Sequence, residues 1–271
     1  MAELVTVEIN NQGIADVRLN RPDKYNALSP EMFQAITDAG ERLANDRSIR
    51  VVVLSGNGRG FCAGLDMSSF QGMADRGAGG KSTDGLLVRD DRPENFAQRP
   101  AFVWKRLPVP VIAALHGVAY GGGCQIALGA DIRFAAPDAK ISILEIKWGL
   151  IPDMSITQTL RDLLPLDLAK ELTFTGRILS GEEAASIGLV THVAEDPHAA
   201  AMALAEEIAG KSPDAVRLGK KLYEESWHAD ARTGLEMESV FQSRLIGSDN
   251  QVESVKANFE NRQPDFKDAQ F

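Results

Sequence analysis

Two glycine-containing turns are the parts of this sequence best suited to hold a negative charge. In residues 51–67, and again in residues 111–130, an apolar run leads into glycines where a helix is expected to begin. Glycine lets the backbone approach a ligand closely, and the free N–H groups at a helix start favour negative charge. Neither turn has the spacing of a dinucleotide-binding fingerprint. Two such turns facing each other could hold one oxyanion, although either turn alone is more simply explained as a tight structural turn.

Glu145 is the acidic residue best placed by its neighbours for proton transfer. It follows Ile143 and Leu144 and precedes Ile146. Burial among apolar side chains raises the pKa of a carboxyl group toward the range that is useful for proton transfer. The alternative is an exposed glutamate paired with Lys147, since most glutamates in proteins are exposed.

The elements that must position these groups alternate between strand and helix over most of the chain. The sequence predicts, in order, a β-hairpin (4–10 and 13–19), a helix over 31–45 that Ser29 and Pro30 begin, buried strands at 51–54 and 110–115, a helix over about 124–130, short strands at 132–136 and 140–143, and a helix over 157–163. The polar segment 66–99 is consistent with a substrate-adjacent lid or a surface insertion. Mostly amphipathic helix follows from His198, which predicts a core over 1–197 and a helical region over 198–271.

Composition favours a globular protein with neither a membrane nor a nucleic acid as its partner. Hydrophobic residues make up 44% and charged residues 25% of the chain, and no apolar run approaches the ~20 residues of a membrane span. The acidic N-terminus is unlike a signal peptide, and the net charge of -9 disfavours general binding to phosphates. The two cysteines, Cys62 and Cys124, lack metal-ligand spacing. We therefore expect no metal site and a reducing, cytoplasmic location.

Both turns carry motifs that resemble those of the crotonase superfamily, the enoyl-CoA hydratase/isomerase family. The resemblance rests on the segments Phe61–Met67 and Gly117–Leu128. It is supported by Arg21–Leu28 near the start, by Ala130–Arg133 after the second turn, and by Arg262–Phe266 near the end. These motifs keep their order over nearly the whole chain.

The resemblance implies an α/β fold, a spiral of strand-strand-helix units with a helical C-terminal region used in trimer or hexamer contacts. It implies that the N–H groups of Ala63 and Gly122 form an oxyanion hole for the carbonyl oxygen of an acyl-CoA thioester. Coenzyme A is then part of the substrate, and no separate cofactor is required. The residues expected at the coenzyme are Arg21, Lys24, Ala27, Leu65 and Asp66, with solvated surface charge as the alternative for the two cations.

Three side chains are expected to decide the reaction. Glu145 matches the second catalytic carboxylate of the family. Gln125 stands where a hydratase of the family has a glutamate, and an amide cannot accept a proton as a carboxylate does. Asp153 stands where the dienoyl-CoA isomerases of the family have a second acid, and its alternative role is to cap the following helix.

These residues favour a double-bond shift with Glu145 as the acid and base. One alternative is an enoyl-CoA hydratase (lyase) of fatty-acid β-oxidation, in which Glu145 acts alone and Gln125 orients the water. A second alternative is a family member that binds acyl-CoA without catalysis, for which the missing glutamate at position 125 is the main argument.

Overall fold

A twisted, mostly parallel sheet forms the centre of the molecule in the computed structural model, which describes residues 3–76 and 90–271. The six-stranded sheet has the order β1-β2-β3-β4-β6-β8, and a two-stranded parallel sheet joins β5 to β7. Strands β1 and β2 pair antiparallel, as the predicted hairpin, and the other strand pairs of the described residues are parallel. The strands are β1 (Val5–Ile9), β2 (Ile14–Leu19), β3 (Val51–Gly56), β4 (Val111–Leu115), β5 (Val118–Tyr120), β6 (Ile132–Ala135), β7 (Lys140–Ser142) and β8 (His192–Val193).

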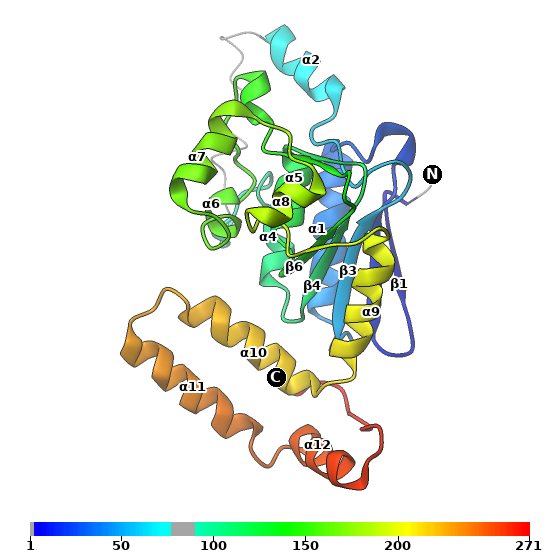
Figure 1. The fold of residues 1–271 in the computed structure, drawn as a ribbon, viewed down its shortest axis with the longest axis vertical. Helices are drawn as coiled ribbons and strands as arrows, with labels where there is room; N and C mark the ends of the chain where they lie inside the picture. The colour runs from blue at the N-terminus through cyan, green and yellow to red at the C-terminus, as the bar shows by residue number, and fades with distance from the viewer. Residues whose placement is uncertain (1–2, 77–89) are drawn as a thin grey trace.

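Helices cover both faces of this sheet and continue beyond it (Figure 1). The α-helices are α1 (Pro30–Ala44), α2 (Met67–Arg76), α4 (Arg99–Arg106), α5 (Gly122–Leu128), α6 (Ile156–Thr159), α7 (Leu166–Thr175), α8 (Gly181–Ser186), α9 (Pro197–Ala209), α10 (Pro213–Ser226), α11 (Ala231–Leu245) and α12 (Asp249–Glu260). Two short 3-10 helices are η1 (Pro22–Lys24) and η2 (Glu145–Trp148). The α/β fold class and the helical C-terminal region that the sequence predicts are confirmed.

Strand β3 is buried on both faces because its side chains are apolar in both directions. Val52 and Leu54 belong to the larger core with α1 and α4, whereas Val51 and Val53 pack in a second cluster under α9. A strand buried on both sides reads as a continuous apolar run, which is how this one was predicted. Helix α1 starts where expected, because the Ser29 side chain accepts the N–H of Met32.

Helix α9 belongs with the sheet, although the sequence places it in the C-terminal region. Its alanines 201, 205 and 209 recur at helical spacing and pack against the strands. Small side chains on one face let a helix approach a sheet closely, and the sequence signal for this is only a row of alanines. The change from core to projecting helices therefore falls between α9 and α10, at residues 210–212.

The first of the projecting helices, α10, is tied to the core by two long cationic side chains. Arg217 donates from Nη2 to the carbonyl oxygen of Ile49 at 3.2 Å, and Lys220 donates from Nζ to that of Val109 at 3.0 Å. Lys220 also pairs with Asp131 at 2.7 Å. Helices α11 and α12 pack on α10 and extend away from the sheet (Figure 1).

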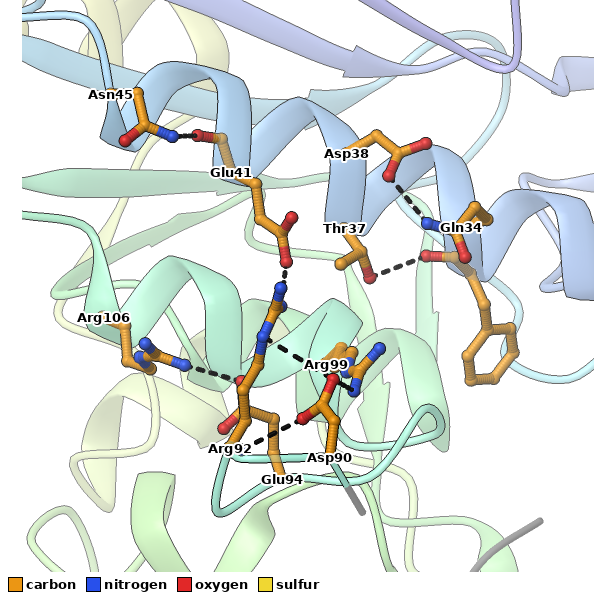
Figure 2. Close-up of polar contacts among 11 residues, drawn as sticks. Gln34, Thr37, Asp38, Glu41, Asn45, Asp90, Arg92, Glu94, Arg99 and Arg106 are labelled. Carbon is orange, nitrogen blue, oxygen red and sulfur yellow. Dashed lines mark hydrogen bonds and ion pairs between the residues drawn. The ribbon is translucent and has the colours of Figure 1, made fainter. Parts of the chain in front are cut away.

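Segment 90–98 is held between α1 and α4 by ion pairs (Figure 2). Arg92 pairs with Glu41 of α1, and Asp90 accepts Arg99 Nη2 of α4 at 2.6 Å. Arg106 at the end of α4 donates to Glu94 at 2.6 Å. The predicted lid or insertion, 66–99, thus begins with helix α2 and ends in this anchored stretch, while residues 77–89 lie outside the described part.

Candidate active site

The first turn is held together by one buried amide, that of Asn26. Its Nδ2 lies 3.0 Å from each of the carbonyl oxygens of Asn57, Gly60 and Phe61. Its Oδ1 accepts the N–H of Arg21 at 2.8 Å. Asn26 is fully buried and has a positive φ of 55°, a conformation that asparagine tolerates better than most residues. The segment before α1 therefore fixes the shape of the glycine-containing turn that follows β3.

The two turns lie against each other, which is the arrangement that would let them hold one oxyanion. The N–H of Cys62 donates to the carbonyl of Val118 at 2.9 Å, and the N–H of Tyr120 donates back to Cys62 at 3.0 Å. A Cβ atom on Gly123 would lie 2.3 Å from the carbonyl oxygen of Cys62. Only glycine permits this approach.

The structure differs from the sequence expectation at Ala63. Its N–H donates to the carbonyl oxygen of Tyr25 at 2.9 Å, so it is not available to a substrate oxygen. Gly64 has a positive φ of 83°, which interrupts the extended backbone between Ala63 and Leu65, so the N–H groups of these two residues do not face the same partner. Ala63 therefore holds the turn to the segment before α1.

The available donor in this turn is the N–H of Leu65. Leu65 lies opposite Leu28 in an isolated parallel bridge, in which the N–H of Leu28 donates to Gly64 and the N–H of Asp66 donates to Leu28. The N–H of Leu65 consequently points away from Leu28, and within the described residues it has no hydrogen-bond partner. The N–H of Gly122, at the first residue of α5, also lacks an intrahelical partner. A Cβ atom on Gly64 would lie 3.5 Å from the nitrogen of Gly122, so the two turns are close at this point.

Glu145 begins η2 and lies beside the second turn. A Cβ atom on Gly121 would be 3.2 Å from Glu145 Oε1. That oxygen accepts Gln125 Nε2 at 2.6 Å, whereas Oε2 is buried without a partner among the described residues. Burial raises the pKa of Glu145, and the hydrogen bond from Gln125 opposes that rise. The surface pairing with Lys147 that was the alternative is not what the structure contains.

Gln125 is completely buried on α5 and uses both ends of its amide. Its Nε2 donates to Glu145 Oε1, and its own Oε1 accepts the N–H of Met154 at 2.8 Å. Met154 in turn packs on the second turn, because its Sδ lies 2.7 Å from where a Cβ atom on Gly122 would be. The sequence contains no sign of this role for Met154. The contact is made by its backbone N–H, which any residue except proline would have.

Asp153 faces the same region as Glu145. Its negative charge contributes to the raised pKa of Glu145, after the larger effect of burial. Although the residue as a whole is exposed, the protein atoms around its carboxyl group raise its own pKa. It does not cap the next helix, because α6 has Ser155 at its N-cap position and no side-chain capping bond.

Two of the residues expected at the coenzyme pair with each other. Arg21 Nη1 donates to Asp66 Oδ2 at 2.5 Å and to the carbonyl oxygen of Ala27 at 3.1 Å. The backbone N–H of Ser68 and the pairing with Arg21 lower the pKa of Asp66 to about 2. The charge of Arg21 is therefore partly neutralised by Asp66. The contacts of Arg21 link the segment before α1 to the end of the first turn.

The remaining residues expected at the coenzyme lie in the first turn and in the segment before α1. Lys24 is the exposed last residue of η1, and Ala27 and Leu65 are half-buried. Arg59 stacks on the ring of Tyr25, with 4.5 Å between its guanidinium carbon and the ring centroid. In residues 3–76 and 90–271, no group of three or more His, Cys, Asp or Glu side chains is arranged to hold a metal ion.

The chain belongs to the enoyl-CoA hydratase/isomerase family, whose family model matches residues 9–269. This confirms the resemblance to the crotonase superfamily that the two turns suggested. The chain is 36% identical to the enoyl-CoA hydratase domain-containing protein 2, mitochondrial, of Mus musculus over 266 residues, which cover 94% of this chain and 85% of the relative. It is 33% identical to methylglutaconyl-CoA hydratase, mitochondrial, of the same organism over 268 residues, which cover 96% of this chain and 82% of the relative.

Solved structures agree with the family assignment. The crystal structure of enoyl-CoA hydratase from Bacillus anthracis matches with a TM-score of 0.85 at 31% identity, covering 97% of this chain and 99% of that chain. The enoyl-CoA hydratase from Mycobacterium tuberculosis H37Rv matches with a TM-score of 0.83 at 32% identity, covering 98% and 99%. Among the helices of the described part, none has the length and apolar character needed to cross a membrane.

Proposed function

We propose that this chain is an enzyme that shifts a carbon–carbon double bond in an acyl-CoA thioester through an oxyanion-stabilised enolate. The observation that carries this proposal is the second oxygen of Glu145, Oε2, which is buried beside the two facing turns and has no partner among residues 3–76 and 90–271. An unpartnered buried carboxylate oxygen is costly, so its retention next to two available N–H donors points to a reacting group rather than a structural one.

The N–H groups of Leu65 and Gly122 would polarise the thioester carbonyl. Glu145 Oε2 removes a proton from C2 of a 3-enoyl thioester, and the electron pair moves onto the carbonyl oxygen as the enolate forms. The same carboxyl group then returns the proton to C4, which leaves the double bond between C2 and C3. Each backbone donor contributes roughly 3–4 kcal/mol to such a transition state.

Coenzyme A enters this reaction only as part of the substrate, and the proposal requires no separate cofactor. Exposed Lys24 is a suitable partner for a phosphate group of the coenzyme, with Arg21, Ala27, Leu65 and Asp66 forming the wall beside it. Asp153 would assist with a longer, conjugated substrate by exchanging a proton at a more distant carbon.

The second candidate reaction is hydration, as in a hydratase of fatty-acid β-oxidation. The names of the two mouse relatives and of the two bacterial enzymes with solved structures favour it, because all four contain the word hydratase. Under this proposal, solvent oxygen enters a 3-hydroxyacyl product. Turnover of 2-enoyl, 3-enoyl and dienoyl thioesters in H₂¹⁸O distinguishes the two reactions.

The decisive variant is Glu145→Gln. It should abolish double-bond migration while acyl-CoA binding remains measurable by calorimetry. Full activity in this variant would reject the assignment of Glu145. Binding without turnover in the unmodified protein, across all chain lengths tested, would instead favour the non-catalytic acyl-CoA-binding role.

The proposal includes assembly into a homotrimer or hexamer through the C-terminal helices, and a cytoplasmic location. Helices α11 and α12 expose large apolar side chains, including Phe259, which is 83% exposed. Exposed apolar surface of this kind marks an interaction site. The mouse relatives carry the word mitochondrial in their names, so cell fractionation is the test of location.

A further inference from the structure

Gln125 is connected at both ends to groups of the candidate site. Its Nε2 donates to Glu145 Oε1 at 2.6 Å and its Oε1 accepts the N–H of Met154 at 2.8 Å. A neutral amide can donate to a carboxylate and accept from a backbone N–H at the same time. An ionised glutamate in its place could only accept.

No atom of Gln125 reaches solvent, since its exposed fraction is 0%. A water molecule in the site therefore cannot contact it in this conformation. This excludes the role in which Gln125 orients an attacking water, unless α5 and η2 separate first.

The two hydrogen bonds of Gln125, called the tether below, also connect the proposed base to the segment that packs on the proposed oxyanion donor. Met154, whose N–H is held by Gln125, packs its Sδ against Gly122. Gly122 supplies one of the proposed oxyanion donors, and Glu145 supplies the proposed base. One buried amide thus sets the position of the base relative to the segment that supports the donor.

We propose that Gln125 is a positioning residue: it holds Oε1 of Glu145, leaves Oε2 as the one oxygen that transfers the proton, and commits the site to chemistry with a single carboxylate. This inference rests on the proposed role of Glu145. It assigns to the amide at position 125 the choice between double-bond migration and water addition.

The test compares Gln125→Met and Gln125→Glu with the unmodified enzyme. The methionine variant keeps the size of the side chain and removes both hydrogen bonds. Since Gln125 stabilises the ionised form of Glu145, its loss raises the pKa of Glu145 further. The acid limb of the kcat profile should therefore move to higher pH, with kcat reduced about 10- to 100-fold, the range for losing one hydrogen bond to a charged group.

The glutamate variant keeps an acceptor for Met154 but places two carboxyl groups at the 2.6 Å contact. They cannot both be ionised at that distance, so the pair must hold a proton. With that proton on the carboxyl group at position 125, the new side chain still donates to ionised Glu145, so the acid limb should move less than in Gln125→Met. A matched control is Gln34→Met, which removes a 2.7 Å amide–carboxylate bond to Asp38 on the exposed face of α1 and should leave the profile unchanged.

Carboxyl-¹³C glutamate NMR provides a readout that does not depend on turnover, with the Glu145 signal assigned by its loss in Glu145→Gln. An upward shift of the Glu145 titration in Gln125→Met supports the tether. An unchanged titration and an unchanged acid limb would overturn it, even if kcat fell through general loss of packing. An unmodified enzyme that turns over no thioester rejects the proposed function, whereas the titration still decides the role of Gln125.

Discussion

Asp153 lies close enough to Glu145 for its negative charge to raise the pKa of the Glu145 carboxyl group. Glu145 is half-buried and Asp153 is exposed, an arrangement in which the outer charge tunes the pKa of the inner group. Removing the charge of Asp153 should therefore change the pKa of Glu145.

Asp153→Asn should lower the pKa of Glu145, because it removes a negative neighbour and so favours the ionised form. Activity that needs ionised Glu145 would then persist to lower pH, and the acid limb of kcat/KM should move down. If Asp153 also exchanges a proton with the substrate, dienoyl thioesters lose far more rate than 3-enoyl thioesters. An equal, small loss on both substrates with no movement of the limb would rule out either role.

Gly122→Ala keeps the backbone N–H but should move it out of place, so we expect kcat to fall by up to about 100-fold, the effect of losing one oxyanion donor, with a smaller effect on binding. The added Cβ atom would lie 2.7 Å from Met154 Sδ and 2.8 Å from Leu28 Cδ1, so the turn must shift. Gly219→Ala on α10 is the matched control, because nothing lies within 4 Å of its Cβ position. Steady-state kinetics on both variants provide the measurement, and equal activity would remove Gly122 from the oxyanion hole.

Replacing the amide of Leu65 with an ester, by incorporating the corresponding α-hydroxy acid, removes its N–H and weakens the Gly64 carbonyl oxygen as the acceptor for the N–H of Leu28. We expect a loss of about 100- to 1000-fold in kcat with little change in stability. The same replacement at Ala63 should instead lower stability by about 1 kcal/mol, because it removes the hydrogen bond to Tyr25. A reversed pattern, with the large kinetic loss at Ala63, would restore Ala63 as the donor.

Asn26→Ala should destabilise the protein by about 3–5 kcal/mol in urea unfolding, because several buried carbonyl groups lose their donor. Asn26→Asp should be at least as costly, since it directs a carboxylate at those oxygens. Asn45→Ala is the control, as its amide makes one exposed bond to Glu41 at 2.8 Å. A loss at Asn26 no larger than at Asn45 would contradict the central role of this amide.

Phe259→Glu, alone and together with Leu235→Glu, should shift the proposed trimer or hexamer toward monomer. Both side chains are largely exposed on the projecting helices, at 83% and 61%. Light scattering over a range of concentrations measures the change, with the exposed polar Glu238 of α11 changed to Gln as the control. A monomeric unmodified protein would reject the proposed assembly before any variant is made.

Much of this fold and its site could be predicted from the sequence, because the deciding signals are local. The hairpin, the Ser29 cap and the apolar run of β3 each depend on residues within one element. The facing turns followed from glycines after strands. Glu145 was identified by its apolar neighbours and by the motif.

The parts that the sequence did not predict depend on pairing across the chain. Which N–H of the first turn is available is decided by the bridge between Leu28 and Leu65, and a shift of one residue exchanges Leu65 for an engaged donor. The contact of Gln125 with the backbone of Met154 spans 29 positions and leaves no mark on the identity of Met154. The predicted helix over 157–163 is only the four-residue α6, because turns continue through the rest.

The Asn26 amide also determines how this half of the site can open. Since the buried Asn26 amide donates to carbonyl oxygens of segment 57–66 and accepts the N–H of Arg21, segments 21–28 and 57–66 are joined through one side chain and should not fray one at a time. They form a single unit of local unfolding, so segment 57–66 and segment 21–28 should open together. The backbone of η2 and of Asp153 makes no hydrogen bond to Asn26 in the described residues, so that side of the site lies outside this unit.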